Sequence, residues 1–272
     1  MIEEIENILH QKVETIEPLF VGLSNDHVLI NHTFFVRIEK KNGRKDVTPK
    51  EEAWIEEKYG NLFHPSFPTL FFDVDKNIKI SLYQPHFEEF SSLNATKEQL
   101  KQIATLLKRL HALKEGKDHL SSFEPLKRMH YYRNEAQVEP HPLEKDIEEN
   151  YTKYDQDLVI CHHDVVPGNL LIKDGHIELI DFEYVGLDDP YFDLASFISE
   201  NNIRDQQMIF FFLASYFLRK PQEKEIEKFA YYLKLNDLLW YYWALMMERK
   251  THQEVYQEIA KEKEEHLRSP FL

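Results

Sequence analysis

Two carboxylates and one amide in a short stretch of the chain constrain its fold and chemistry more than any other sequence feature. Asp164 and Asn169 lie five positions apart between two short β-like runs, and Asp181 ends the β-like run that follows. Gly175 is placed to turn the hairpin between the later runs. This order can bring the three polar side chains to a common point. Oxygen ligands suit Mg²⁺, and a separate carboxylate can accept the proton of a hydroxyl group, so the pattern predicts metal–phosphate chemistry.

The spacing of apolar residues predicts a β-rich first third followed by a mainly helical remainder. Residues 97–111 have helical spacing, whereas residues 115–142 contain Pro and His and are expected to form loops. A helix is expected to begin at Pro49, and helices are expected beyond Asp189. The other expected elements are a helix at 2–12, strands at 13–20, 27–32, 34–40, 69–74 and 78–84, and short strands at 159–160, 170–172 and 177–180.

This order of elements predicts an α+β fold with two lobes. The character of the sequence changes after Gln84, which places the boundary at residue 85. The predicted domains are therefore a β-rich N-terminal lobe over residues 1–85 and a mainly helical C-terminal lobe over residues 86–272. The Glu- and Lys-rich stretch at 258–266 is interpreted as a solvated helix face with i,i+4 ion pairs.

Composition excludes several classes of protein. The 33 Lys and Arg residues against 48 Asp and Glu residues give a formal charge of −15, which disfavours binding to nucleic acid but not to a nucleotide carried with a metal. The single cysteine, Cys161, excludes an intrachain disulfide and a multi-cysteine zinc site. The acidic residues 1–12 do not resemble a secretory signal, and the apolar runs 208–218 and 238–247 are too short to span a bilayer. We therefore expect a cytoplasmic protein without membrane insertion.

The segment around Asp164 resembles a known catalytic loop. His162-x-Asp164-x-x-x-x-Asn169, followed by Asp181-Phe182-Glu183, is similar to the catalytic loop and metal-binding motif of the protein-kinase-like fold in small-molecule kinases. Ile180–Tyr184 and Phe192-Asp193-Leu194 are most similar to the choline/ethanolamine kinase family, within the broader aminoglycoside phosphotransferase group. The resemblance implies a two-lobed kinase fold, ATP and Mg²⁺ as cofactors, and phosphorylation of the hydroxyl group of choline, with ethanolamine second.

The resemblance also assigns roles to individual residues. Asp164 is the expected catalytic base, Asn169 and Asp181 are the expected Mg²⁺ ligands, and Asp193 is expected to support the catalytic loop. Arg37 is expected to contact nucleotide phosphates and to be oriented by a helix carboxylate, either Glu51 or Glu52. The remaining expected nucleotide contacts are a phosphate turn made of Gly22, Leu23, Ser24 and Asn25, and a hinge made of Tyr83, Gln84 and His86. The turn departs from the family pattern because it holds one Gly and is followed by Asp26, and the role of His163 is left open.

Two tryptophans late in the chain bear on the substrate. Trp240 and Trp243 lie at i and i+3 in a helical run, so their indoles share a face, and Trp faces are the best partners for a quaternary ammonium group. The resemblance implies that both residues, together with Glu200, bind choline. Three alternatives stay open at this stage: another cationic alcohol such as an aminoglycoside or thiamine, an inactive kinase-like binding module, and a plain core role for the tryptophans.

Overall fold

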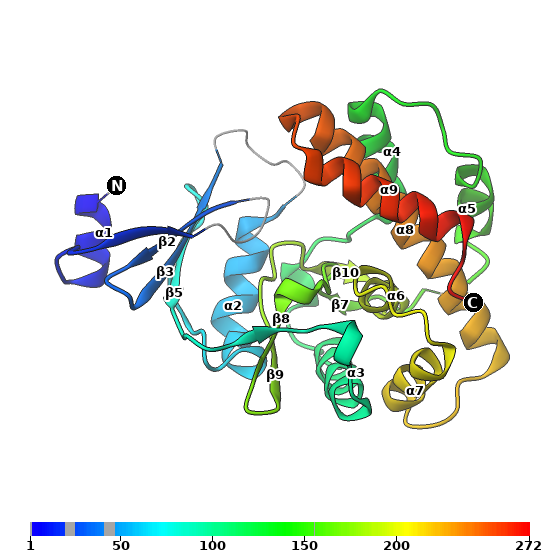
Figure 1. The fold of residues 1–272 in the computed structure, drawn as a ribbon, viewed down its shortest axis with the longest axis horizontal. Helices are drawn as coiled ribbons and strands as arrows, with labels where there is room; N and C mark the ends of the chain where they lie inside the picture. Colours follow the sequence, from blue (N-terminus) through cyan, green and yellow to red (C-terminus); the bar gives the residue numbers. More distant parts are fainter. Residues whose placement is uncertain (1, 20–24, 41–46, 155) are drawn as a thin grey trace. The chain divides into compact units, whose positions relative to one another are not determined.

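The computed structural model describes residues 2–19, 25–40, 47–154 and 156–272, which fall into two units (Figure 1). The first unit comprises the chain up to Phe90 together with Gly168–Tyr184, and the second comprises Ser91–Pro167 and Val185–Leu272. The β-rich part is thus followed by a mainly helical part, as the sequence predicts. The predicted lobe boundary at residue 85 stays a prediction, and the returning segment 168–184 was not anticipated.

An antiparallel sheet forms the centre of the first unit. Its strand order is β1-β2-β3-β5-β4, with consecutive strands paired in hairpins except where β3 pairs with β5. Helix α1 packs on the sheet because Ile5 joins a buried cluster with Ile30, Val36 and Ile80. The bounds are α1 (Ile2–Leu9), β1 (Ile16–Leu19), β2 (Asn25–Ile30), β3 (Phe34–Glu39), β4 (Thr69–Asp73) and β5 (Ile78–Leu82).

Helix α2 (Pro49–Phe63) connects β3 to β4 and begins at Pro49, as predicted. Proline suits this position because its fixed φ is helical and the first N–H of a helix needs no partner. The buried face of α2 is unusual because it carries two carboxylates, Glu52 and Glu56, beside the apolar Ile55. Ionised carboxylates are buried only when they are paired, so this face requires cations on the sheet.

The segment 168–184 adds a second small sheet to the first unit. Strands β6 (Glu88–Glu89), β8 (Leu170–Lys173) and β9 (His176–Leu179) are antiparallel, in the order β6-β8-β9. Gly175 turns the β8–β9 hairpin with a φ of 79°, a conformation that costs glycine least. The hairpin register pairs Leu170 with Leu179, so the residues just before β8 and just after β9 are neighbours.

The second unit is mainly helical. Helix α3 starts with a capping box, in which Thr96 Oγ1 accepts from the Gln99 N–H and Gln99 Oε1 accepts from the Thr96 N–H. A two-stranded antiparallel pair, β7 with β10, lies among the helices.

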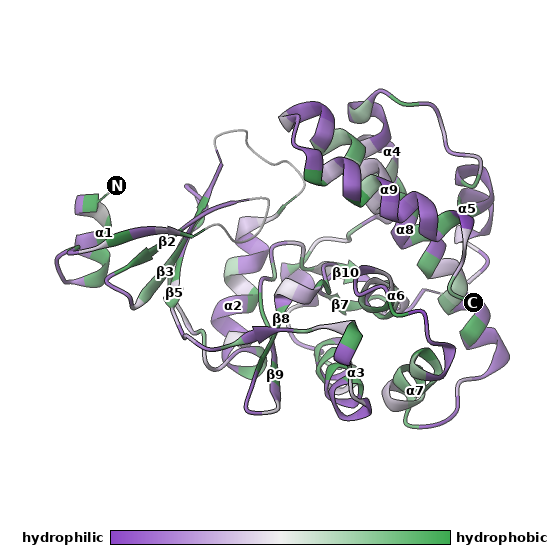
Figure 2. Ribbon diagram, in the orientation of Figure 1, coloured by the Kyte–Doolittle hydropathy of each residue, from purple (hydrophilic) through white to green (hydrophobic). Residues whose placement is uncertain are grey.

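In Figure 2 the ribbon of α9 is coloured mostly hydrophilic. The bounds are α3 (Lys97–His111), α4 (Pro125–Ala136), α5 (Glu144–Tyr151), β7 (Val159–Cys161), β10 (Gly186–Asp188), α6 (Tyr191–Glu200), α7 (Gln206–Phe217), α8 (Glu223–Thr251) and α9 (Glu254–Arg268), with 3₁₀ turns at Ser92–Asn94, Lys117–His119 and Pro167–Asn169.

The prediction of loops over residues 115–142 is wrong, because α4 occupies Pro125–Ala136. The helix is hard to see in the sequence since it is mostly polar. Its buried side chains follow helical spacing but include only two large apolar residues; they are Pro125, Met129, Tyr132 and Ala136. Helix α5 was not predicted either. Among the residues that the structure describes, no helix is both long and apolar enough to cross a membrane. The cytoplasmic location stays a prediction.

Candidate active site

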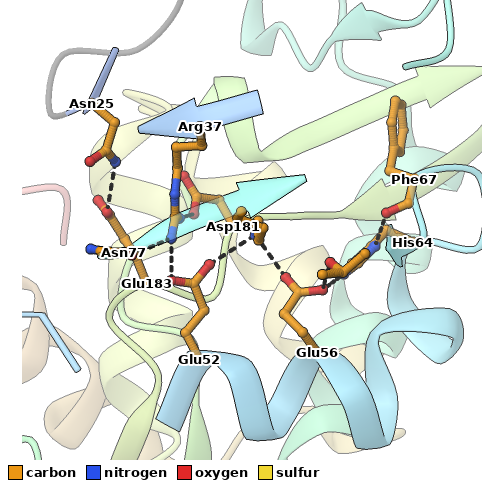
Figure 3. Close-up of polar contacts among 11 residues, drawn as sticks. Asn25, Arg37, Glu52, Glu56, His64, Phe67, Asn77, Asp181 and Glu183 are labelled. Carbon is orange, nitrogen blue, oxygen red and sulfur yellow. Dashed lines mark hydrogen bonds and ion pairs between the residues drawn. The ribbon is translucent and has the colours of Figure 1, made fainter. Parts of the chain in front are cut away.

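Arg37 on β3 joins three elements of the first unit (Figure 3). Its Nη1 donates to Asp181 Oδ1 at 2.8 Å, and its Nη2 donates to Glu52 Oε2 at 2.6 Å on α2. The same Nη2 lies 3.3 Å from Asn77 Oδ1, in the turn before β5. The side chain is only 2% exposed. The helix carboxylate that orients Arg37 is therefore Glu52, while Glu51 accepts from the Thr48 hydroxyl at the start of α2.

Electrostatics keep Arg37 charged. Burial alone would lower the pKa of the guanidinium, but the negative charges of Glu52, Asp181 and Glu183 outweigh it and raise the pKa above its ordinary value. A guanidinium suits this position because its separate N–H groups reach two carboxylates at once, which a single ammonium nitrogen does less well.

A second cation, Lys79, extends this arrangement along α2. Lys79 lies opposite Arg37 in the β3–β5 register, and its Nζ donates to Glu52 Oε1 at 2.8 Å and to Glu56 Oε1 at 3.0 Å. Burial would raise the pKa of Glu56, but Lys79 and His64 together hold it well below its usual range. Burial would likewise lower the pKa of Lys79, and the two carboxylates raise it instead. The sequence analysis missed Lys79 and Glu56.

His64 is the last polar side chain of this series. Its Nε2 lies 3.1 Å from Glu56 Oε2, and its Nδ1 lies 3.1 Å from the carbonyl oxygen of Phe67. Thr69 also donates to Glu56 Oε2, at 2.8 Å. Arg37, Glu52, Lys79 and Glu56 thus alternate in charge and lead to the His64 ring, and we call these five residues the buried ladder. The ladder connects the loop after α2 to Asp181, which the sequence predicts as a metal ligand.

Asp181 is held in an uncommon backbone conformation, with a φ of 65°. Non-glycine residues adopt this region rarely, and such strain is often found at functional sites. The Ile180 N–H donates to the Asn169 carbonyl at 3.0 Å, so the two predicted metal ligands are neighbours across the β8–β9 ladder. The pair offers one carboxylate and one amide oxygen, a donor set that fits Mg²⁺.

The first residue of β2, Asn25, contacts the segment that carries Asp181. Asn25 is buried and its Nδ2 donates to Glu183 Oε2 at 3.1 Å, two residues after Asp181. Asn25 is the one residue of the predicted phosphate turn that is described, since Gly22, Leu23 and Ser24 lie outside the described residues. In the predicted hinge, Tyr83 and Gln84 are half-buried and His86 is exposed with a φ of 67°.

In the second unit, the loop that carries Asp164 is held through its backbone by α6. The N–H groups of His162 and His163 donate to the two oxygens of Asp193, at 2.7 and 2.8 Å. The Val165 N–H donates to Ser196 Oγ at 3.1 Å. The prediction that Asp193 supports this loop is confirmed. Asp164 itself is half-buried.

Asp193 is itself fully buried and paired. Burial would raise its pKa, but hydrogen bonding and charge from His111, whose Nε2 lies 3.0 Å from Oδ2, lower it to about 2. His163, whose role the sequence leaves open, stacks on Phe123 with ring centroids 3.8 Å apart and lies edge-on to Phe192. Its Nε2 lies 3.5 Å from Asp188. His163 is therefore a packing residue beneath the loop.

The predicted substrate residues Trp240 and Trp243 share a face of α8 with ring centroids 5.6 Å apart at 86°. Tyr256 of α9, which the sequence analysis missed, continues the group, 5.5 Å from Trp243 at 79°. All three residues are buried. Trp243 Nε1 has no hydrogen-bond partner in the part of the chain that the structure describes. Buried indole N–H groups usually have partners, so this one suits a site that a polar ligand completes.

Glu200 ends α6 and is mostly buried. Its Oε1 accepts from Lys263 Nζ of α9 at 2.6 Å. Burial raises the pKa of Glu200 despite the nearby ammonium. The interpretation of residues 258–266 as a solvated helix face is wrong at Lys263 and His266, which are both buried.

Comparison with known proteins gives the family. Residues 15–217 match the Phosphotransferase enzyme family. The chain belongs to this family. It is 24% identical to protein LicA of Haemophilus influenzae over 270 residues, which is 90% of this chain and 77% of that protein.

Solved structures agree with the fold. The crystal structure of choline kinase LicA from Streptococcus pneumoniae matches with a TM-score of 0.78 at 22% identity, covering 98% of this chain and 97% of that one. A structure of LicA in complex with AMP matches with a TM-score of 0.79 at 22% identity, covering 98% and 96%. The predicted family, the α+β kinase-like fold and the phosphotransferase class are confirmed.

The buried ladder explains a glycine within α2 and gives a prediction. A Cβ at Gly60 would lie 3.0 Å from Glu56 Oε2 and 3.2 Å from His64 Cε1. Replacing a mid-helix glycine by alanine normally stabilises by about 0.5–1 kcal/mol. Here we expect Gly60→Ala to lower the free energy of unfolding by about 1–3 kcal/mol, measured by urea denaturation, because it crowds the ladder.

Glu57→Ala is the matched control, since Glu57 is exposed on the same helix and its replacement should change stability by less than about 0.5 kcal/mol. A Gly60→Ala variant that is more stable than the wild type would contradict the close packing of Glu56 and His64.

Proposed function

We propose that this phosphotransferase transfers the γ-phosphoryl group of ATP to the hydroxyl group of choline, with ethanolamine as the second substrate. The observation that carries the choline assignment is the group of three buried aromatic rings, Trp240, Trp243 and Tyr256, on α8 and α9. Faces of aromatic rings attract a quaternary ammonium, which has no N–H to donate. The similarity to a choline kinase and to a protein complexed with AMP supports both the acceptor and a nucleotide donor.

The residues of the first unit would hold the nucleotide and its metal. Arg37 would contact the nucleotide phosphates, and the buried ladder fixes its direction. Asn169 and Asp181 would hold Mg²⁺, which when bound neutralises charge on the phosphates during transfer. Asn25, with the rest of the predicted phosphate turn, would cover the phosphates, and Tyr83, Gln84 and His86 would form the hinge against the adenine.

Asp164 would act as the base. Its carboxylate accepts the proton of the choline hydroxyl while the hydroxyl oxygen bonds to the γ-phosphorus. The bond from that phosphorus to the bridging oxygen breaks, and ADP leaves with the bond's electron pair. The backbone hydrogen bonds to Asp193 and Ser196 keep the loop in place, so Asp164 needs little reorganisation at the moment of transfer. Because Asp164, Asn169 and Asp181 are all retained, an inactive binding module is the weaker alternative.

Product analysis with a panel of alcohols tests the proposal. The wild type incubated with ATP and Mg²⁺ should yield ADP and the phosphate monoester of choline in equal amounts, with less from ethanolamine and none from an aminoglycoside or thiamine. Asp164→Asn keeps the shape of the side chain but removes the proton acceptor, so turnover should fall by about 10²–10⁴ while nucleotide still binds. Asp181→Asn should instead weaken Mg²⁺-dependent nucleotide binding.

Wild-type turnover in Asp164→Asn would show that Asp164 is not the base. Phosphorylation of an aminoglycoside in preference to every small amino alcohol would contradict the choline proposal and favour an aminoglycoside phosphotransferase instead.

A second test addresses the aromatic group. A desolvated cation–π contact contributes roughly 2 kcal/mol, which is about 30-fold in affinity. Trp243→Ala should therefore raise the KM for choline strongly, leave the KM for ATP near its wild-type value, and narrow the gap between choline and ethanolamine. Trp243→Phe should have a milder effect because a weaker aromatic face remains. Steady-state kinetics with each substrate measures all three quantities.

The control compound is 3,3-dimethylbutanol, which has the shape of choline without its charge. If it competes with choline as well as choline analogues do, the site recognises shape alone. Unchanged choline kinetics in Trp243→Ala would mean that the tryptophans are core residues.

A further inference from the structure

A protein ammonium group already occupies the acceptors around Glu200. Lys263 is almost fully buried, with 2% of its side chain exposed. Its Nζ donates to Glu200 Oε1 at 2.6 Å and to Ser199 Oγ at 2.8 Å, and lies 3.5 Å from Asp237 Oδ1. Two of the three donors of the ammonium are thus in short hydrogen bonds, and the contact with Asp237 is a longer ion pair. Asp237 Oδ1 also accepts from Ser199 Oγ and from His266 Nδ1.

The charges of this cluster do not cancel. Two carboxylates, Glu200 and Asp237, face one ammonium, which leaves one net negative charge among the three groups. Burial would lower the pKa of Lys263, but Glu200 and Asp237 raise it, so the ammonium stays protonated. Glu200 Oε2 forms no hydrogen bond or ion pair with another described residue, and the side chain keeps 16% of its surface exposed. One carboxylate oxygen therefore remains for a ligand.

The cluster around Lys263 lies next to the aromatic group of Trp240, Trp243 and Tyr256. Asp237 precedes Trp240 by three residues on α8, which is about 4.5 Å along the helix axis. Tyr256 and Lys263 are seven residues apart on α9 and share a face. Trp243 contacts Tyr256 and Asp237 contacts Lys263, so α8 and α9 run antiparallel. The aromatic rings therefore lie beside the charged groups along the two helices.

We propose that Lys263 determines the substrate class, by occupying Glu200 Oε1 and Ser199 Oγ so that the site favours a quaternary over a primary ammonium. This inference rests on the proposed function, and names the residue that sets the choice between choline and ethanolamine.

The physical reason lies in the number of donors. The ammonium of ethanolamine has three N–H groups, and leaving a desolvated donor without an acceptor costs binding energy. The cluster offers it Glu200 Oε2, while Lys263 holds Glu200 Oε1 and Ser199 Oγ. Choline has no N–H groups and needs only the net negative charge and the aromatic faces. A lysine that bonds these oxygens thus weakens the binding of ethanolamine without affecting the binding of choline.

The experiment compares kcat/KM for choline and ethanolamine in the wild type and in Lys263→Met, which keeps an unbranched side chain one atom shorter and removes the ammonium. We expect kcat/KM for ethanolamine to rise and the choline-to-ethanolamine ratio to fall at least tenfold, as for one charge-assisted hydrogen bond gained by the substrate. Lys261→Met is the matched control, because Lys261 is exposed on the same helix, and its ratio should equal that of the wild type.

Lys263→Met leaves two buried carboxylates without their cation, so a second variant guards against misfolding. Lys263→Met combined with Asp237→Asn restores the wild-type net charge of the cluster and should show the same fall in the ratio. A folded variant that phosphorylates choline with an unchanged ratio overturns the role of Lys263 and leaves the proposed function standing. A wild type that phosphorylates no amino alcohol overturns both.

Discussion

The ion pair between Arg37 and Glu52 is the interaction on which the polar site of the first unit depends. It joins the sheet to α2, and the second arm of the same guanidinium holds Asp181. Removing one partner of a buried pair leaves an uncompensated charge and costs about 3–5 kcal/mol, whereas the pair itself adds little stability. The pair therefore specifies an arrangement more than it stabilises the fold. Lys79 and Glu56 follow from it, because each buried charge requires a partner of opposite sign, and His64 lies against Glu56 at the end.

In the second unit, a buried and paired carboxylate likewise fixes the loop that carries Asp164. Asp193 is buried, fully paired and ionised, and its two oxygens accept from consecutive backbone N–H groups before Asp164. A carboxylate that binds backbone fixes the path of a loop without occupying its side chains. His163 stacks on Phe123 and so packs the same loop against its surroundings.

The sequence predicts the parts of the site that lie in short motifs and misses those that distant segments contribute. Asp164, Asn169 and Asp181 fall within one stretch whose spacing is informative, and α3 is predicted to the residue because its apolar residues follow helical spacing. Lys79 was missed because a lone lysine on a strand resembles a surface charge until its neighbour Arg37 is known. Lys263 was missed because it lies in a run of Glu and Lys, a pattern that predicts a solvent-exposed helix face. The carboxylates of α6 and α8 that it binds are far away in the sequence. Helix α4 was missed because most of its residues are polar and only a few, all of them apolar, are buried.

A comparison of two adjacent glutamates tests the role of the buried ladder most directly. Glu52 and Glu51 lie side by side on α2, but only Glu52 binds Arg37 and Lys79, while Glu51 accepts from Thr48. Calorimetric titration with ATP and Mg²⁺ should show at least tenfold weaker nucleotide binding for Glu52→Gln and wild-type binding for Glu51→Gln, because only the first variant releases Arg37. Equal affinities in two folded variants would contradict the claim that the ladder positions the nucleotide site.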